Sequence, residues 1–324
     1  MTARGTREPA GDGRGVHEFL RIADEVAAAL RDGRPVVALE STLISHGFPY
    51  PENLAIARDS ETAVREHGAV PATVAIRDGR LLVGLAPDDL ESLATTHGVA
   101  KVARPTLAAA LSRGGWGATT VSATMIAAHA AGIAVFATGG IGGVHRGALT
   151  GASGVPGSFD ISADLDELAR TDVIVVCAGP KLILDVPLTV EALETRGVPL
   201  VTIGSDEVPG FWARRSGVRS PIVVASTEEA ARVAGTHLRL AIGTGMLVCA
   251  PVPEPDEVPR ERIEGVIKRA SAEAATAGVR GADLTPWLLG RIADLTEGAS
   301  VQANLSLVRN NARTAARIAV ALAS

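Results

Sequence analysis

Short apolar runs alternate along the chain with longer segments in which apolar residues recur every three or four positions. The runs lie at 36–39, 133–137, 173–178, 198–204, 221–226 and 245–251. Such runs are typical of buried strands, and the longer segments are typical of amphipathic helices. Helices that alternate with apolar strands indicate a largely parallel sheet covered on both faces. The pattern therefore predicts a single three-layer α/β/α domain.

Helical periodicity first occurs at 17–32. A second helix is expected to begin at Asn53 or a neighbour, whose side chain caps it, and to end near Glu66. Between the helices, residues 73–85 predict two strands joined by an Asp78-Gly79 turn. The proline-rich acidic segment 251–259 predicts an extended crossover. Further helices are predicted at 87–96, 105–113, a stretch ending near Ala131, 228–240, 259–277, 285–296 and 301–323.

Length and composition set limits on the class of protein. The chain has 324 residues, of which 47% are hydrophobic and 21% charged, so it can bury a substantial core. Residues 1–15 are polar and glycine-rich and lack the apolar segment of a secretory signal, so we expect a frayed tail followed by one domain over 16–324. No apolar run approaches the roughly 20 residues that span a bilayer.

Charge and cysteine content narrow the partners and the compartment. The net charge is −5 and aromatic residues make up 3%, which weighs against nucleic-acid binding but leaves an anionic small substrate possible. Cys177 and Cys249 each lie inside an apolar run. We expect buried free thiols, which fits a reducing cytoplasm.

Reactive residues are densest between Thr138 and Lys181. The segment opens with TGGIGGVHRG directly after an apolar run. Glycines let the backbone approach a ligand and turn its N–H groups toward an anion. The dinucleotide fingerprint fails, because His145 stands where its third glycine is required. A tight turn after a strand explains the glycines equally well.

Lys181 follows the continuous apolar run Val173–Ala178. A lysine that is partly removed from water more readily presents a neutral amine, which can attack an aldehyde to form an imine. The alternative is a surface lysine whose stem covers apolar surface, and position alone favours that alternative.

Two carboxylates lie four residues apart, at Asp160 and Asp164, with Ser162 between them. On a helix they would share one face and, with water, could hold a hard cation such as Mg²⁺ or Mn²⁺. The alternative is helix capping by Asp160 or Ser162, and we expect both uses together.

Other candidate groups lie at strand ends and in loops. Glu40 ends the first apolar run and could act as a general acid or cap the next helix. His145 could be a base or a hydrogen-bond donor, or be merely structural. Lys101 and Arg104 could neutralise a phosphate or form a solvated face.

Seven sequence blocks resemble the pseudouridine-5′-phosphate glycosidases, also called the indigoidine synthase A family. They are VALESTLISHGFPYPEN, KVARPTL, TTVSATM, ATGGIGGVHRGA, FDISADL, VVCAGPK and NLSLVRNNA, and they extend from about 36 to 311. The blocks are long and specific. The resemblance implies a single α/β/α domain, a cytoplasmic enzyme and a homotrimer.

The resemblance also implies the reaction and its residues. Members of the family reversibly cleave pseudouridine 5′-phosphate to uracil and ribose 5-phosphate. Lys181 would be the nucleophile that forms an imine with the ring-opened sugar, and Glu40 the proton donor. Asp160 would hold Mn²⁺, or Mg²⁺ in its place, through a mostly hydrated shell. Residues matching substrate contacts are Lys101, Val121, Ser162, Ala163 and Asp164, with His145 and Asn304 near the base.

Three stretches depart from the family pattern: the glycine-rich 146–158, Pro180 before the lysine, and 205–221. They could reshape the region that receives the base without removing a catalytic group. Two alternatives therefore stay open. One is a C-ribosyl synthase that attaches ribose 5-phosphate to an aromatic acceptor, and the other is a non-catalytic sugar-phosphate binding protein. Retention of Glu40, Asp160 and Lys181 argues against the second.

Overall fold

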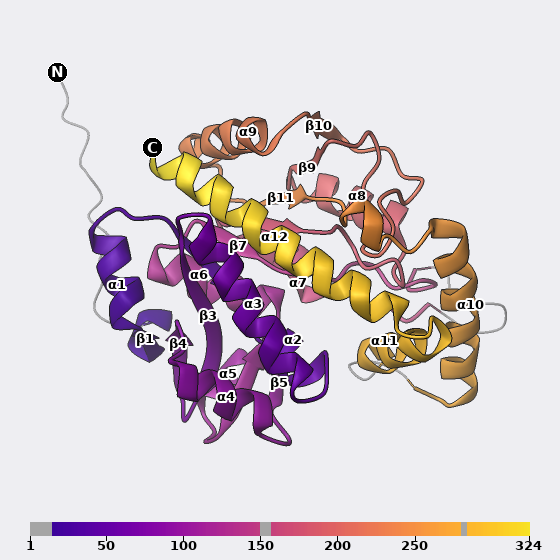
Figure 1. The fold of residues 1–324 in the computed structure, drawn as a ribbon, viewed down its shortest axis with the longest axis horizontal. Helices are drawn as coiled ribbons and strands as arrows, with labels where there is room; N and C mark the ends of the chain where they lie inside the picture. Colours follow the sequence, from indigo (N-terminus) through magenta and orange to yellow (C-terminus); the bar gives the residue numbers. More distant parts are fainter. Residues whose placement is uncertain (1–14, 150–156, 280–283) are drawn as a thin grey trace.

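A long, mostly parallel sheet forms the centre of the computed structural model, which describes residues 15–149, 157–279 and 284–324 (Figure 1). Its strand order is β1-β4-β3-β2-β7-β8-β11-β9-β10, and β6 pairs with β3 and β5. Strand pairs are parallel except β3 with β4 and with β6. The strands are β1 (Leu20–Ile22), β2 (Val36–Leu39), β3 (Val70–Arg77), β4 (Arg80–Val83), β5 (Ala100–Val102), β6 (Trp116–Thr119), β7 (Val135–Ala137), β8 (Ile174–Cys177), β9 (Leu200–Ile203), β10 (Ile222–Val224) and β11 (Met246–Cys249).

Helices cover both faces of the sheet. The long α12 crosses one face beside α3, with α9 near its C-terminal end, and α6 and α7 lie behind the sheet in Figure 1. The α-helices are α1 (Asp24–Arg31), α2 (Thr42–His46), α3 (Glu52–Glu66), α4 (Pro87–Thr95), α5 (Leu107–Leu111), α6 (Val121–Ala131), α7 (Ala163–Leu168), α8 (Val186–Thr195), α9 (Thr227–Leu240), α10 (Arg260–Thr276), α11 (Leu284–Leu295) and α12 (Ala299–Ala323). Short 3-10 turns occupy Val16–Phe19, Arg104–Thr106 and Glu254–Asp256.

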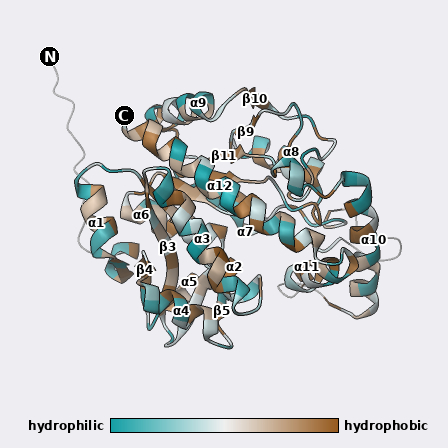
Figure 2. Ribbon diagram, viewed as in Figure 1, coloured by the Kyte–Doolittle hydropathy of each residue, from teal (hydrophilic) through white to brown (hydrophobic). Residues whose placement is uncertain are grey.

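Burial on both faces explains why the central strands are uniformly apolar. Every residue of β2, β8 and β11 is buried, as expected where helices cover both sides of a parallel sheet. Small residues on the inner face of α12, such as Ala312 and Ala316, let this helix approach the sheet closely. Figure 2 shows α3 and α12 with both hydrophilic and hydrophobic residues along their lengths, as expected of helices with one buried face.

The predicted fold class is confirmed, and so are most of the predicted elements. Strands form at β2, β7, β8, β9, β10 and β11 within the apolar runs, and β3 and β4 meet at the Asp78-Gly79 turn. The final helices lie within two residues of their predicted bounds. Cys177 and Cys249 pair in register on β8 and β11 as buried free thiols. The predicted tail falls almost entirely on residues 1–14, outside the described residues.

Two local predictions are wrong. The helix predicted over 17–32 begins only at Asp24, because Leu20–Ile22 pairs with β4 as a strand. Asn53 does not cap α3, whose cap position is Pro51. Its side chain instead donates hydrogen bonds of 2.9 Å to the carbonyls of Ile44 and Ala94. Asn53 therefore fixes α2, the helix after Glu40, against α3 and α4. The crossover over 251–259 also contains a 3-10 turn.

The carboxyl ends of β2, β7 and β8 lie side by side at one edge of the sheet. These parallel strands are direct neighbours, so the residues that follow them meet there. They are Glu40 after β2, the glycine turn after β7 and Lys181 shortly after β8. Open parallel sheets bind their ligands at this edge. Among the described residues, none of the helices combines the length and apolar character needed to cross a membrane.

Candidate active site

A cavity of about 590 Å³ opens at this edge of the sheet. Its walls come from the ends of β2, β7 and β8, the start of α6, the segment before α7, and helices α11 and α12. Nine of the ten predicted site residues line it: Glu40, Lys101, Val121, His145, Asp160, Ser162, Asp164, Lys181 and Asn304. The tenth, Ala163, is the first residue of α7 and is not part of the lining.

Lys181 is half-buried and its amine is held by the glycine turn. The Nζ donates a hydrogen bond of 2.5 Å to the carbonyl of Gly140 and lies 5.8 Å from the centre of the Phe211 ring. A side chain at position 140 would overlap Phe211 at 2.6 Å and the Gly179 carbonyl at 2.8 Å. The glycine therefore allows a close approach that places its carbonyl beside the amine.

Asp164 joins the glycine turn to the start of α6. It is 7% exposed, and its two oxygens accept hydrogen bonds from the backbone N–H groups of Gly142 (2.9 Å) and Ser122 (3.1 Å). The backbone N–H of Gly142 therefore faces an anion, as predicted for the glycine turn. That anion is the carboxylate of Asp164. Asp160 precedes α7, so the expected shared helix face does not exist, and Ser162 alone caps the helix.

Glu40 is held by two threonines. The hydroxyl of Thr42 donates to Oε2 and the hydroxyl of Thr138 donates to Oε1. The carboxyl group does not cap α2, whose cap residue Ser41 accepts no side-chain bond. Hydroxyl groups both donate and accept, so they can turn and keep their contacts when the carboxyl is protonated. The arrangement suits a group that gives and regains a proton.

His145 lies beside Asp160 in the lining of the cavity. Its Nδ1 is 3.9 Å from Oδ2 of Asp160. Burial lowers the pKa of His145 below its ordinary value, and Lys101 and Lys181 act in the same direction while Asp160 opposes them. The ring is therefore largely neutral at pH 7, with one nitrogen able to donate and the other to accept.

Asp160 is the carboxylate in this cavity that is predicted to hold a divalent cation. Among the described residues, no cluster of three or more His, Cys, Asp or Glu side chains could hold a metal ion. Both oxygens of Asp164 already accept backbone N–H groups, whereas Asp160 is partly exposed. Mg²⁺ and similar ions often keep most of their water and bind through one or two carboxylates. Asp160 fits a mostly hydrated ion and does not form a protein cage.

From the sequence, Arg104 could neutralise a phosphate or form a solvated face. In the structure it pairs with a carboxylate instead. Its guanidinium pairs with the carboxylate of Glu167, which is fully buried and also accepts from the Thr171 hydroxyl. The backbone N–H of Arg104 donates to the Ser122 hydroxyl at 3.1 Å. This residue therefore ties the segment after β5 to α6 and α7, and it is not part of the cavity lining.

Among the described residues of the cavity, His46 and the predicted Asn304 each have a buried side-chain atom without a hydrogen-bond partner, Nε2 and Oδ1 respectively. The sequence assigned no role to His46. Burial and the charge of Lys101 lower the pKa of His46, so its ring favours the neutral form. Phe211 and the wall formed by α11 carried no recognisable signal. Both reach the site through packing of distant segments.

Of the stretch 146–158, which departs from the family pattern, residues 150–156 lie outside the described residues. Arg146 donates to the carbonyls of Leu182 (2.7 Å) and Leu184 (3.2 Å). It thereby attaches the start of this stretch to the chain just after Lys181.

Comparisons with known proteins agree on one family. The family described as indigoidine synthase A like protein matches residues 25–321. A curated relative from Deinococcus radiodurans, named pseudouridine-5′-phosphate glycosidase, is 54% identical and covers 97% of both chains. One of the same name from Nocardioides sp. is 53% identical, over 94% of this chain and 96% of the relative.

Solved structures give the same result. The prealnumycin C-glycosynthase AlnA, crystallised with ribulose 5-phosphate, is 38% identical with a TM-score of 0.85. An indigoidine synthase A-like protein from Thermotoga maritima is 33% identical with a TM-score of 0.83. Each comparison covers 94% of this chain and 97% of the other.

The pairing of the partly exposed Arg104 with the fully buried Glu167 predicts a large effect on stability. Arg104→Ala would leave the Glu167 carboxylate buried without its counter-charge, so we expect the free energy of unfolding to fall by about 3 kcal/mol. The control is Arg58→Ala, because Arg58 pairs with Glu91 at 3.1 Å in an exposed position. That change should cost less than about 1 kcal/mol. Urea unfolding measures both, and equal losses would contradict this role for Arg104.

Proposed function

This chain belongs to the indigoidine synthase A-like family, and we propose that it reversibly cleaves the C–C glycosidic bond between ribose 5-phosphate and a base. The proposed reaction converts pseudouridine 5′-phosphate and water to uracil and ribose 5-phosphate. The observation that carries the proposal is that a lysine amine, a carboxyl group and a second lysine line one cavity. Relatives that match nearly the full length of this chain are named pseudouridine-5′-phosphate glycosidase.

The bond to be broken explains why an amine is needed. A C–C glycosidic bond has no oxygen or nitrogen leaving atom to protonate, so hydrolysis by two carboxylates does not suit it. We propose that the neutral amine of Lys181 attacks C1′ as the bond from C1′ to the ring oxygen breaks, which leaves an open-chain sugar bonded to both the lysine nitrogen and the base. The base carbon then takes up a proton and leaves with the electrons of the C–C bond, while the nitrogen lone pair forms the C=N bond of the imine. Water then releases ribose 5-phosphate and restores the amine.

In this proposal Glu40 supplies the proton that opens the sugar ring. Its carboxyl group protonates the ring oxygen as the amine adds to C1′. The hydroxyls of Thr42 and Thr138 hold the carboxyl group in position through both protonation states. Such a positioned acid is what distinguishes a catalytic cavity from a simple binding pocket.

The remaining lining residues would hold the two ends of the substrate. Lys101, Val121 and the Ser162–Asp164 run would contact the sugar phosphate, with Lys101 supplying positive charge. His145 and Asn304 would face the base. The unpartnered Oδ1 of Asn304 supports this, because it can accept an N–H from a pyrimidine edge.

We further propose that Asp160 holds a Mn²⁺ ion, or Mg²⁺, through a mostly hydrated shell. Such an ion would supply positive charge that neutralises the phosphorylated substrate. The homotrimer and the cytoplasmic location implied by the resemblance are also retained as proposals.

A C-ribosyl synthase is the second candidate, favoured by the similarity to AlnA. It would use the same amine and acid, and it would attach ribose 5-phosphate to an aromatic carbon. Release of uracil from pseudouridine 5′-phosphate supports the glycosidase. Coupling to an aromatic acceptor without uracil release supports the synthase. A sugar-phosphate sensor would give neither.

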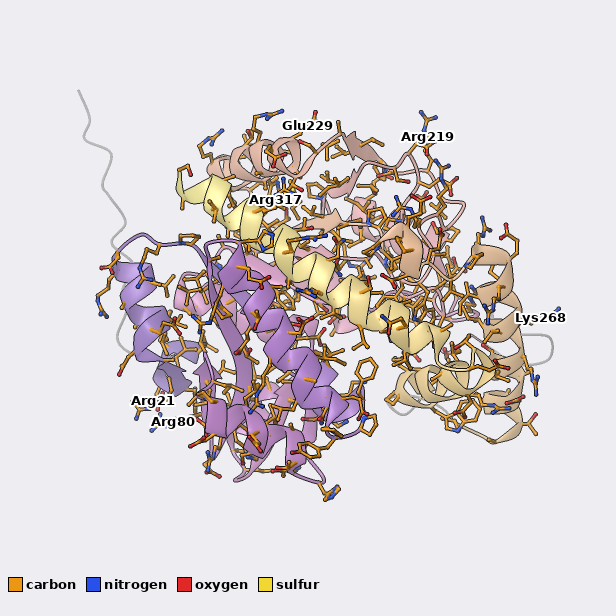
Figure 3. The ribbon with its side chains drawn as sticks, in the orientation of Figure 1. Arg21, Arg80, Arg219, Glu229, Lys268 and Arg317 are labelled. Carbon is orange, nitrogen blue, oxygen red and sulfur yellow. The ribbon has the colours of Figure 1, made fainter. Side chains whose placement is uncertain are left out.

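Replacing the proposed nucleophile tests this function. We expect Lys181→Met to lower the rate of uracil release by at least about 10³-fold, because no imine can form without the amine. Lys268→Met is the control, since Lys268 lies on the outer side of α10 away from the cavity (Figure 3). Uracil is followed by absorbance after chromatography. Activity of the Lys181 variant equal to the control would contradict the proposed role.

Removal of divalent cations tests the role of Asp160. We expect EDTA to abolish uracil release and added Mn²⁺ to restore it, with Mg²⁺ less effective. Asp160→Asn should bind Mn²⁺ more weakly in calorimetry, because a neutral amide is a poorer ligand for a hard cation. Asp166→Asn, which alters an exposed carboxylate paired with Arg196, is the control. Full activity of metal-free protein would refute the proposal.

A further inference from the structure

A second, much smaller cavity lies behind Glu40, on the side of α3 and α12. Its volume is about 20 Å³, and most of its wall is apolar. The polar groups that reach it are Glu40, Thr138, Thr73 and Ser60. A buried space needs roughly 10–15 Å³ to hold one water, and the water needs two to four polar partners. This cavity meets both conditions.

Thr73 connects this cavity to a carboxyl group on α3. It lies on β3 in register with Leu39, the residue before Glu40, and it is 2% exposed. Its hydroxyl donates a hydrogen bond of 2.6 Å to Oε1 of Glu61. On the other side of the cavity, the Thr138 hydroxyl donates to Glu40. A single water could therefore join two threonine hydroxyls, each already bonded to a carboxyl group.

Glu61 lies between this buried chain and the protein surface. It is partly exposed, and the exposed ion pair of Glu25 and Arg65 lies beside it. Burial raises the pKa of Glu61 above its ordinary value, and Glu25 adds to the increase. The bond from Thr73 and the charges of Arg65 and Arg58 act in the opposite direction. Glu61 therefore keeps its proton to a higher pH than an exposed glutamate does.

We propose that Glu61, Thr73, one water and Thr138 form a proton relay that supplies Glu40 from the side opposite the substrate. The inference rests on the proposed function, in which Glu40 gives a proton to the ring oxygen. The substrate then covers the front of Glu40, so the replacement proton has to come from behind.

The proton balance of the relay is simple. When Glu61 is protonated, the Thr73 hydroxyl turns from Oε1 of Glu61 to donate to the water. Glu61 then gives its proton to the Thr73 oxygen while the Thr73 hydroxyl proton passes to the water. The water passes one proton to the Thr138 oxygen, and the Thr138 hydroxyl proton passes to Glu40. Each hydroxyl and the water gain one proton and lose one. Glu61 is left ionised and regains its proton from solvent, and the reverse sequence removes a proton from Glu40.

Steady-state uracil release by Thr73→Val and Glu61→Gln tests the relay. We expect each change to lower kcat about tenfold, with little change in KM. The loss is smaller than the full rate enhancement of a general acid, because Glu40 itself is still present. The solvent deuterium isotope effect on kcat should increase, because proton resupply becomes slower than the other steps. Thr73→Ser, which keeps the hydroxyl, should restore most of the rate.

The pH profile separates the relay from a merely structural role. In the wild type, kcat should decline as pH rises through the pKa of Glu61, since only the protonated carboxyl can donate. Glu61→Gln should lack this decline. Thr202→Val is the matched control, because Thr202 is a buried threonine on β9 whose hydroxyl bonds Ser220 away from the cavity. It should leave kcat, the isotope effect and the pH profile unchanged.

The possible outcomes are distinct. Thr73→Val and Glu61→Gln variants that fold and match an active wild type in kcat, isotope effect and pH profile would overturn the relay alone. A folded, metal-loaded wild type that releases no uracil would overturn the proposed function and the relay together. If Thr73→Val lowers the melting temperature severely, the comparison of Glu61→Gln with wild type decides the question.

Discussion

The backbone of the glycine turn, residues 139–143, is the constraint on which the cavity depends. Asn311 on α12 is fully buried and donates to the carbonyls of Thr138 (2.8 Å) and Gly139 (3.2 Å). Asp164 accepts the Gly142 N–H from the opposite side. Held in this way, the turn presents the Gly140 carbonyl to the Lys181 amine. Helix α12, the start of α6 and the segment after β8 thus meet through one short stretch of backbone.

This arrangement gives Glu40 two different environments. Its front faces the large cavity together with Lys181, and its back faces a space large enough for one water. Of the two threonines that hold the carboxyl group, Thr42 is the first residue of α2 and Thr138 directly follows β7. A parallel sheet can place an acid and an amine side by side in this way because its strand ends share an edge. The helices behind the edge then determine how protons reach the acid.

Much of the fold and part of the site could be predicted from the sequence, because they depend on local patterns. Apolar runs predict β2, β8 and β11 because these strands are buried on both faces, and Glu40 and Lys181 follow such runs directly. Contacts between distant segments could not be predicted. From the sequence, Arg104 could be a phosphate ligand or a solvated residue, because its partner Glu167 lies 63 positions away along the chain.

The same limit applies to the residues that complete the cavity. The spacing of Asp160 and Asp164 suggested a shared helix face, but α7 begins only at Ala163, so the two carboxylates have separate uses. Phe211 and α11 reach the site through tertiary packing, which no local pattern encodes. Glu61 and Thr73 are ordinary residues of an amphipathic helix and a strand. Only the structure brings them to the back of Glu40.

Formation of an imine at Lys181 is the central claim, and borohydride trapping tests it most directly. The protein is incubated with ribose 5-phosphate, reduced with borohydride, and digested for peptide mass mapping. The account predicts one reduced sugar-phosphate adduct on the peptide that contains Lys181, and no adduct in Lys181→Ala. Equal labelling of wild type and Lys181→Ala, or an adduct confined to other lysines, would contradict it.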